Sequence, residues 1–120
     1  MNKGRKITGG KYHANRKKKH HEKQSQERLV KIGDEKKKQI RKRGGSKKTV
    51  LLRTNLINLT IDGKAVKTEI KNVLETPQNK FLARQNRLMK GSVVDTAKGK
   101  ARITNRPSQE GCVNAILLKE

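Results

Sequence analysis

The clearest secondary-structure pattern lies in residues 49–75, TVLLRTNLINLTIDGKAVKTEIKNVLE. An apolar run occupies residues 50–61, and the pair Asp62-Gly63 follows it directly. Asp-Gly is typical of the two-residue turn that joins antiparallel strands. Residues 66–70 then alternate Val, Thr and Ile with charged side chains, which predicts a strand with one buried face. The stretch therefore predicts a β-hairpin.

The rest of the C-terminal part carries further short strand patterns. Residues 93–96 and 100–104 bracket Ala-Lys-Gly and predict a second hairpin, and the apolar residues 112–118 predict a final strand. Residues 81–88 fit either a strand or a helical turn, and residues 106–111 are expected to form a loop. About six short strands separated by Gly, Pro and Asn favour a mostly β fold, a small antiparallel β-barrel.

Charge and apolar residues are unevenly distributed along the 120 residues, whose net charge is +22. Residues 1–48 carry 19 Lys+Arg against 4 Asp+Glu and only 8 apolar residues. Residues 49–120 carry 13 Lys+Arg, 6 Asp+Glu and 28 apolar residues. Burial of so few apolar groups does not offset the entropy lost on ordering the first segment. We expect a basic, extended arm over residues 1–48, disordered when free, and a small barrel domain over residues 49–120.

Composition excludes several classes of protein. Apolar runs reach only four or five residues, as at residues 115–118, which is too short to span a bilayer. No apolar stretch follows the basic N-terminus, so a secretory signal is not expected. The single cysteine, Cys112, cannot form an internal disulfide, which favours a reducing, cytoplasmic location.

The chain is not expected to be an enzyme. Its carboxylates are scattered singly, and its three histidines (His13, His20 and His21) all lie in the arm without a second cysteine to complete a zinc site. Cys112 opens an apolar strand and is expected to be a core thiol rather than a nucleophile. We therefore expect no cofactor, no metal and no small-molecule substrate.

The charge predicts a polyanionic partner, because each Lys or Arg that reaches a phosphate releases condensed counterions. Tyr12 and Phe81 are the only aromatic residues, and Phe81 is expected in the core, so stacking on loose single strands is not expected. Binding should follow the phosphates of folded RNA, with a histone-like DNA-compacting protein as the alternative. Binding to a membrane surface is not expected, because the sequence has no amphipathic basic helix.

The order of several short motifs resembles one family, the archaeal and eukaryotic small-subunit ribosomal protein numbered eight, of the e-type. The motifs are RKITGGK at residues 5–11, KIGDEK at 31–36, RKRGGSK at 41–47, KGSVV at 90–94, GKARITNRP at 99–107 and GCVNA at 111–115. They cover nearly the whole chain in the family's order. The short length is similar to archaeal members.

The resemblance implies a structural role in the small ribosomal subunit, with a β-barrel at its surface and an N-terminal extension laid into rRNA. Its partners would be small-subunit rRNA and neighbouring small-subunit ribosomal proteins. A ribosome-assembly factor that shares the barrel is the alternative within this class. The positions matching the extension, expected to bind RNA, are Arg5, Lys6, Thr8, Gly9, Gly10, Lys11, Arg16, Lys17, Lys18, Lys19, Arg41, Lys42, Arg43, Gly44, Gly45, Lys47 and Lys48.

The barrel is expected to contribute a second set of RNA contacts along one edge. Its candidates are Arg84, Arg87, Lys90, Arg102 and Arg106. Arg41 and Arg43 are suited to bidentate phosphate contacts because their guanidinium groups are planar forks, whereas the lysine runs supply mobile charge.

Overall fold

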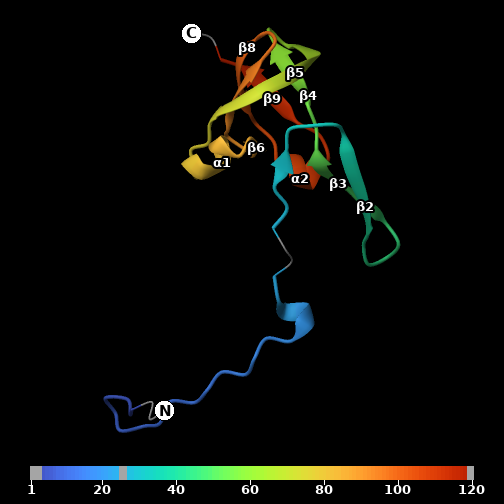
Figure 1. The fold of residues 1–120 in the computed structure, drawn as a ribbon. Coiled ribbons are helices and arrows are strands. Elements are labelled where there is room, and N and C mark those ends of the chain that lie inside the picture. Colours follow the sequence, from blue (N-terminus) through green and yellow to red (C-terminus); the bar gives the residue numbers. More distant parts are fainter. Residues whose placement is uncertain (1–3, 25–26, 119–120) are drawn as a thin grey trace.

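The computed structural model describes residues 4–24 and 27–118, an elongated molecule of 65 × 40 × 25 Å (Figure 1). A closed barrel occupies one end, a second sheet packs below it, and the N-terminal segment extends away from both. The mostly β fold class is confirmed. Among the described residues, no helix has the length and apolar character needed to cross a membrane.

The barrel contains β4 (Leu56–Ile61), β5 (Lys64–Glu75), β7 (Val93–Thr96), β8 (Gly99–Ile103) and β9 (Asn114–Leu117). Neighbouring strands are antiparallel, except that β4 pairs in parallel with β9 and thereby closes the barrel. The expected antiparallel barrel of about six strands is therefore wrong in two respects: five strands close it, and one pair is parallel. Four successive antiparallel pairs leave β9 running in the same direction as β4, so the pair that closes a barrel of five strands must be parallel.

Both predicted hairpins are confirmed. Asp62 and Gly63 join β4 to β5 with φ values of 47° and 81°, the positive values that a type I′ turn needs. On β5, Thr68 and Ile70 are buried, while Lys67 and Glu69 are exposed. This alternation follows from the pleat, which directs successive side chains to opposite faces.

The apolar run of residues 50–61 splits at Thr54 into two strands that belong to different sheets. Thr54 is buried, its Oγ1 accepts a hydrogen bond from the Leu56 amide (3.1 Å), and its own amide donates to the Lys31 carbonyl (3.1 Å). These bonds satisfy the backbone at the corner, where the strand ladder is interrupted.

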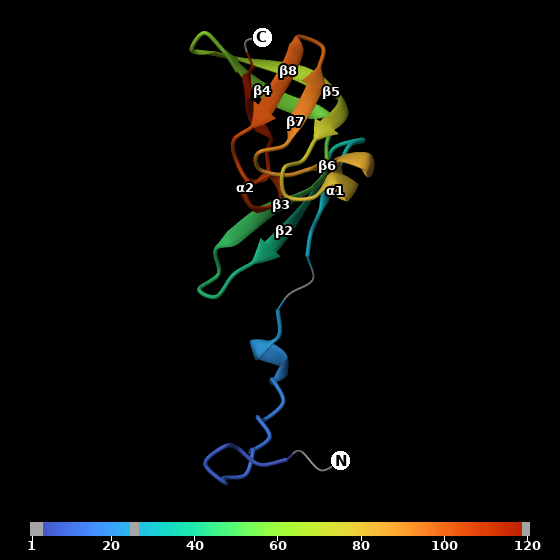
Figure 2. The ribbon, with the colours of Figure 1, turned by 90° about the vertical axis from the view of Figure 1, so that its left-hand side faces the viewer.

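The second sheet has the order β2-β3-β1-β6, with β1 (Val30–Lys31), β2 (Lys36–Arg41), β3 (Lys47–Arg53) and β6 (Arg87–Leu88). Strands β2 and β3 form an antiparallel hairpin that projects below the barrel (Figure 2). The boundary expected between residues 48 and 49 lies inside β3, so the sheet contains chain from both sides of it.

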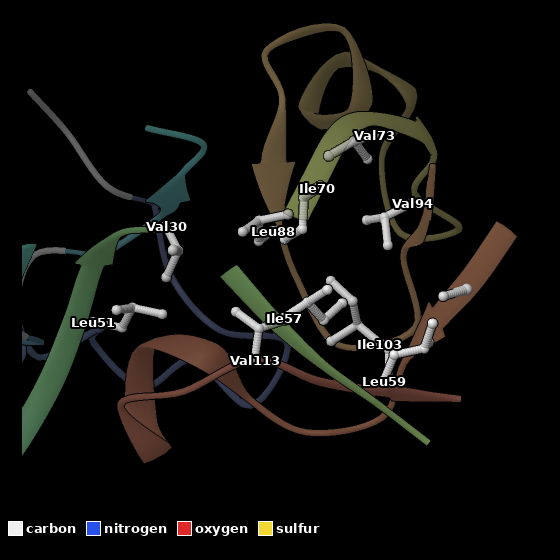
Figure 3. Close-up of a cluster of buried hydrophobic side chains, with 12 residues drawn as sticks. Val30, Leu51, Ile57, Leu59, Ile70, Val73, Leu88, Val94, Ile103 and Val113 are labelled. Atoms are coloured by element: carbon white, nitrogen blue, oxygen red, sulfur yellow. The ribbon is translucent and has the colours of Figure 1, made fainter. Parts of the chain in front are cut away.

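One core joins the two sheets. Val30 and Leu51 come from β1 and β3, and they belong to the same buried cluster as Ile57 and Ile103 of the barrel (Figure 3). Every member of this cluster is aliphatic. Because Val30 is 1% exposed, the packed body begins at β1.

Two short helices, α1 and α2, lie in the two segments for which the sequence predicted no definite helix. Residues 81–88 divide between α1 (Lys80–Arg84) and β6, and the expected loop at residues 106–111 contains α2 (Pro107–Glu110). A proline in the first turn and Gly111 after the last are typical helix boundaries. Phe81, expected in the core, is 66% exposed, because α1 packs on the core through Ala83. Cys112 is also partly exposed rather than a core thiol.

Candidate nucleic-acid interface

The chain before β1, residues 4–29, is called the outer arm here. Its residues 4–24 are all exposed and carry eight Lys+Arg, with Glu22 as the only carboxylate in that stretch. In both views the outer arm runs away from the barrel (Figures 1 and 2). An exposed basic strand of this kind can follow a line of phosphates, because none of its charges is covered by the protein's own core.

The tip of the outer arm folds into a compact turn over residues 5–11. Arg5 and Lys11 form an isolated antiparallel bridge, and the Lys6 amide donates to the Gly10 carbonyl (2.9 Å). Arg5 also donates from Nη1 to the Gly9 carbonyl (3.1 Å). The turn brings together the first group of predicted contacts: Arg5, Lys6, Thr8, Gly9, Gly10 and Lys11.

The second group of predicted contacts, residues 16–19, precedes the 3₁₀ turn η1 (His20–Glu22). Arg16 binds Glu22 in a bidentate ion pair, with N–O distances of 2.6 and 2.8 Å. This ion pair lowers the pKa of Glu22, helped by the Lys19 amide, and raises the pKa of Arg16. Arg16 is thus held by its own chain, whereas Lys17, Lys18 and Lys19 are exposed and form no ion pair with any described residue.

The third group lies at the tip of the β2–β3 hairpin, in residues 41–48. Arg41 on β2 lies opposite Lys47 on β3, and the Lys42 amide donates to the Ser46 carbonyl (2.7 Å) to close the loop. Every residue from 41 to 47 is exposed. The hairpin therefore concentrates Arg41, Lys42, Arg43, Gly44, Gly45, Lys47 and Lys48 at one projecting end.

The five barrel candidates occupy four different places. Lys90 and Arg106 line one cavity of about 330 Å³ beside the outer arm, together with Arg28. Arg84 lies on α1, and Arg102 lies on the exposed face of β8. The structure thus brings Lys90 and Arg106 together but leaves Arg84 and Arg102 on other elements.

Arg87 is placed differently from the other candidates. It is partly buried on β6, its Nη1 donates to the Leu29 carbonyl (3.4 Å), and its Nε is buried without a partner among the described residues. The Arg87 guanidinium therefore contacts the base of the outer arm.

Several exposed cations and the exposed ring of Phe81 were not among the residues expected to bind RNA. Lys36 and Lys38 lie exposed on β2, next to the basic hairpin tip, and Arg28 lines the cavity with Lys90. The run of three lysines at residues 36–38 was a usable signal for the strand. Nothing in the sequence indicated that Phe81 would be exposed.

Metal binding has no support in residues 4–24 and 27–118, where no three His, Cys, Asp or Glu side chains gather in a way that could hold an ion. The arrangement instead offers cations at the arm tip, along the arm and on the hairpin, and these groups are suited to phosphate oxygens.

The sequence was also compared with the models of known protein families. The model of the family described as Ribosomal protein S8e matches residues 1–118.

The chain belongs to the ribosomal protein S8e family. Relatives named small ribosomal subunit protein eS8 align over almost their whole length. The protein of Methanococcoides burtonii is 39% identical, covering 96% of this chain and 94% of the relative. That of Methanocella arvoryzae is 41% identical (95% and 93%), and that of Methanococcus aeolicus is 42% identical (97% and 93%).

Membership of the S8e family confirms the resemblance drawn from the ordered motifs. The chain is a ribosomal protein and a structural component rather than an enzyme, and its location is the ribosome of the cytoplasm. Coverage of 93–94% of these archaeal relatives also confirms the short, archaeal-type form.

Proposed function

We propose that this chain is a structural constituent of the small ribosomal subunit that binds and stabilises folded small-subunit rRNA through phosphate contacts. The names of its relatives support the subunit. The observation that carries the RNA contacts is residues 4–24 of the outer arm, in which every residue is exposed and cations outnumber carboxylates eight to one.

The outer arm and the β2–β3 hairpin act where RNA helices pack closely. Their cations offset the repulsion between neighbouring phosphates, and the two-sheet body anchors them. The outer arm gains its order from the RNA, since none of its described residues is buried in the protein. Neighbouring small-subunit proteins are the second class of partner.

The test is a comparison of the full chain with a variant lacking residues 1–24, which keeps β1 and the whole core. Filter binding to small-subunit rRNA is measured at several salt concentrations. The truncated variant should bind at least tenfold more weakly and with a shallower salt slope, by about 0.9 for each phosphate contact removed. Equal affinity and equal slope would disprove the role of the outer arm.

A sedimentation experiment separates the alternatives from the proposal. Co-migration with the mature small subunit in moderate salt supports a stable constituent. Recovery only in precursor particles would indicate an assembly factor. Recovery on DNA, away from both, would indicate a DNA-compacting protein.

A further inference from the structure

The chain has one Tyr, one Phe and no Trp, and both rings lie at the surface. Tyr12 is 55% exposed and Phe81 is 66% exposed. Each ring also has a cation above it, with the Lys6 Nζ and the Arg84 Cζ both 5.8 Å from the ring centroid. The core is therefore entirely aliphatic, and the aromatic surface of the chain is available for contact with a partner.

Phe81 is held on a rigid support, unlike Tyr12 on the outer arm. The side chain of Asn79 begins α1 by accepting a hydrogen bond from the Phe81 amide (2.9 Å), and Ala83 packs on the core. Gln78, just before the helix, donates from Nε2 to the Lys90 carbonyl (2.7 Å). A ring fixed in this way loses little entropy when a ligand stacks on it.

The surroundings of Phe81 combine apolar surface with positive charge. Lys80 and Arg84 line a cavity of about 350 Å³ together with Leu74, which is 49% exposed, and a single carboxylate, Glu75. Phe81 is not part of this lining, and its ring is linked to the cavity through Arg84, which lies over it. A nucleotide presents a flat π face and an anionic phosphate, which match the ring and the two cations. The net charge of +22 favours this polyanionic ligand over an apolar protein segment.

We propose that Phe81 and Arg84 form a stacking site for an unpaired nucleobase of the bound RNA, with Lys80 at its phosphate. This inference rests on the proposed function and adds a base contact to the phosphate contacts. In both ribbon views α1 lies on the side of the molecule away from the tip of the β2–β3 hairpin (Figures 1 and 2). The RNA would thus be held at two separate surfaces of the folded body.

The first test uses Phe81→Trp, which places the chain's single tryptophan on α1. Binding to protein-free small-subunit rRNA and the tryptophan emission are measured in the same titration. Binding should stay within about twofold of the unmodified chain, and stacking should quench at least half of the emission. The control is Ala65→Trp, at an exposed position next to the β4–β5 turn. Because this turn is distant from α1 in both ribbon views, the control should bind equally without quenching.

Binding without quenching of Trp emission in the Phe81→Trp variant would overturn the stacking site while leaving the proposed function intact. Absence of rRNA binding by the unmodified chain would overturn both. The two failures are therefore distinguishable.

The second test is Phe81→Leu, which keeps an apolar side chain but removes the flat ring. Because the ring is exposed, this variant should melt at the same temperature as the unmodified chain. Its affinity for the rRNA should fall about tenfold, the typical effect of losing one base–aromatic stack. Unchanged rRNA affinity would overturn the proposal. The proposal would also be overturned if Phe81→Leu weakened binding only to another small-subunit protein, a result that would make the surface around Phe81 a protein-docking surface.

Discussion

Arg87 Nη1 donates a hydrogen bond to the carbonyl of Leu29, 3.4 Å away, across 58 positions of sequence. Leu29 is the last residue before β1, where the outer arm joins the folded body. Strand β1, which begins just after Leu29, also pairs with β6, the strand of Arg87, and Lys31 lies opposite Arg87. A cation expected at an RNA-facing edge thus holds the point from which the outer arm departs.

Replacing Arg87 should loosen this junction. We expect Arg87→Ala to destabilise the protein by about 1 kcal/mol, because a hydrogen bond from a partly buried charged group is lost. Amide exchange at Val30 and Lys31 should accelerate, since β6 pairs with one of the two edges of β1. Arg102→Ala, at an exposed position on β8, is the matched control and should change stability by less than about 0.5 kcal/mol. Equal effects of the two substitutions would contradict the anchoring role.

The cross-strand pair Arg41 and Lys47 places two like charges opposite each other. We expect Lys47→Glu to stabilise the free protein by about 0.2–1 kcal/mol and to weaken rRNA binding, since an attractive pair replaces a repulsive one while the hairpin tip loses positive charge. Thermal unfolding and filter binding measure the two effects. Lys64→Glu, at the β4–β5 turn, changes the net charge equally and should leave rRNA binding close to normal. A similar loss of binding in both variants would indicate a dependence on total charge alone.

Glu22 occupies the Arg16 guanidinium, which we expect to contact RNA. Glu22→Gln should release the Arg16 guanidinium, raise rRNA affinity and steepen the salt slope by about 0.9, the value for one additional phosphate contact. The slope of log affinity against log salt concentration is the measurement. The double variant Glu22→Gln with Arg16→Gln is the control and should return to the original slope. A slope unaffected by Glu22→Gln would mean that Arg16 does not reach a phosphate.

Glu110 makes stability depend on pH. Its carboxylate accepts hydrogen bonds from the Arg106 amide (3.2 Å) and from Asn105 Nδ2 (3.1 Å), and these contacts lower the pKa of Glu110. A lowered pKa contributes stability that is complete above the ordinary value of 4.5 and is lost as the pH falls through the lowered value. Melting temperatures measured from neutral pH downward should therefore fall less steeply in Glu110→Gln.

The control for Glu110 is Glu69→Gln, an exposed carboxylate on β5. Its melting temperature should follow that of the unmodified chain at every pH. If Glu110→Gln loses as much stability in acid as the unmodified chain, the acid sensitivity belongs to other groups.

Gly111 couples α2 to the β2–β3 hairpin. Its φ is 78°, and an added Cβ would lie 3.2 Å from the Thr49 carbonyl oxygen. Gly63 has a similar φ of 81° but open space around it. We expect Gly63→Ala to cost about 1 kcal/mol from backbone strain alone, and Gly111→Ala to cost about 2 kcal/mol because the contact with β3 is added. Denaturant unfolding gives both values, and equal costs would show that Thr49 yields without penalty.

Local sequence signals were sufficient where neighbouring residues decide the structure. The Asp62-Gly63 turn and the alternation on β5 were predictable, because a type I′ turn and a half-buried strand each need a particular residue type at each position. The ordered basic motifs were sufficient for the family. For the same local reason, Pro107 and Gly111 marked the ends of α2, a signal that the expected loop overlooked.

The placement of the candidate site was less predictable. Basic residues indicated a polyanionic partner, but their grouping depends on which strands pair. Lys90 and Arg106 meet Arg28 at one cavity only because the chain before β1 passes beside them. Phe81 was expected inside because phenylalanine is usually buried, yet the aliphatic core is complete without it.

By itself, the sequence determined the mostly β class, the uneven charge, the hairpins and the family, since each depends on composition or on residues close together in the chain. Only the tertiary structure decided that Thr54 divides one apolar run between two sheets, that β9 closes the barrel in parallel with β4, and that Arg87 faces Leu29. These features join residues up to 58 positions apart. Such contacts are selected by the packing of the whole core, which no local pattern encodes.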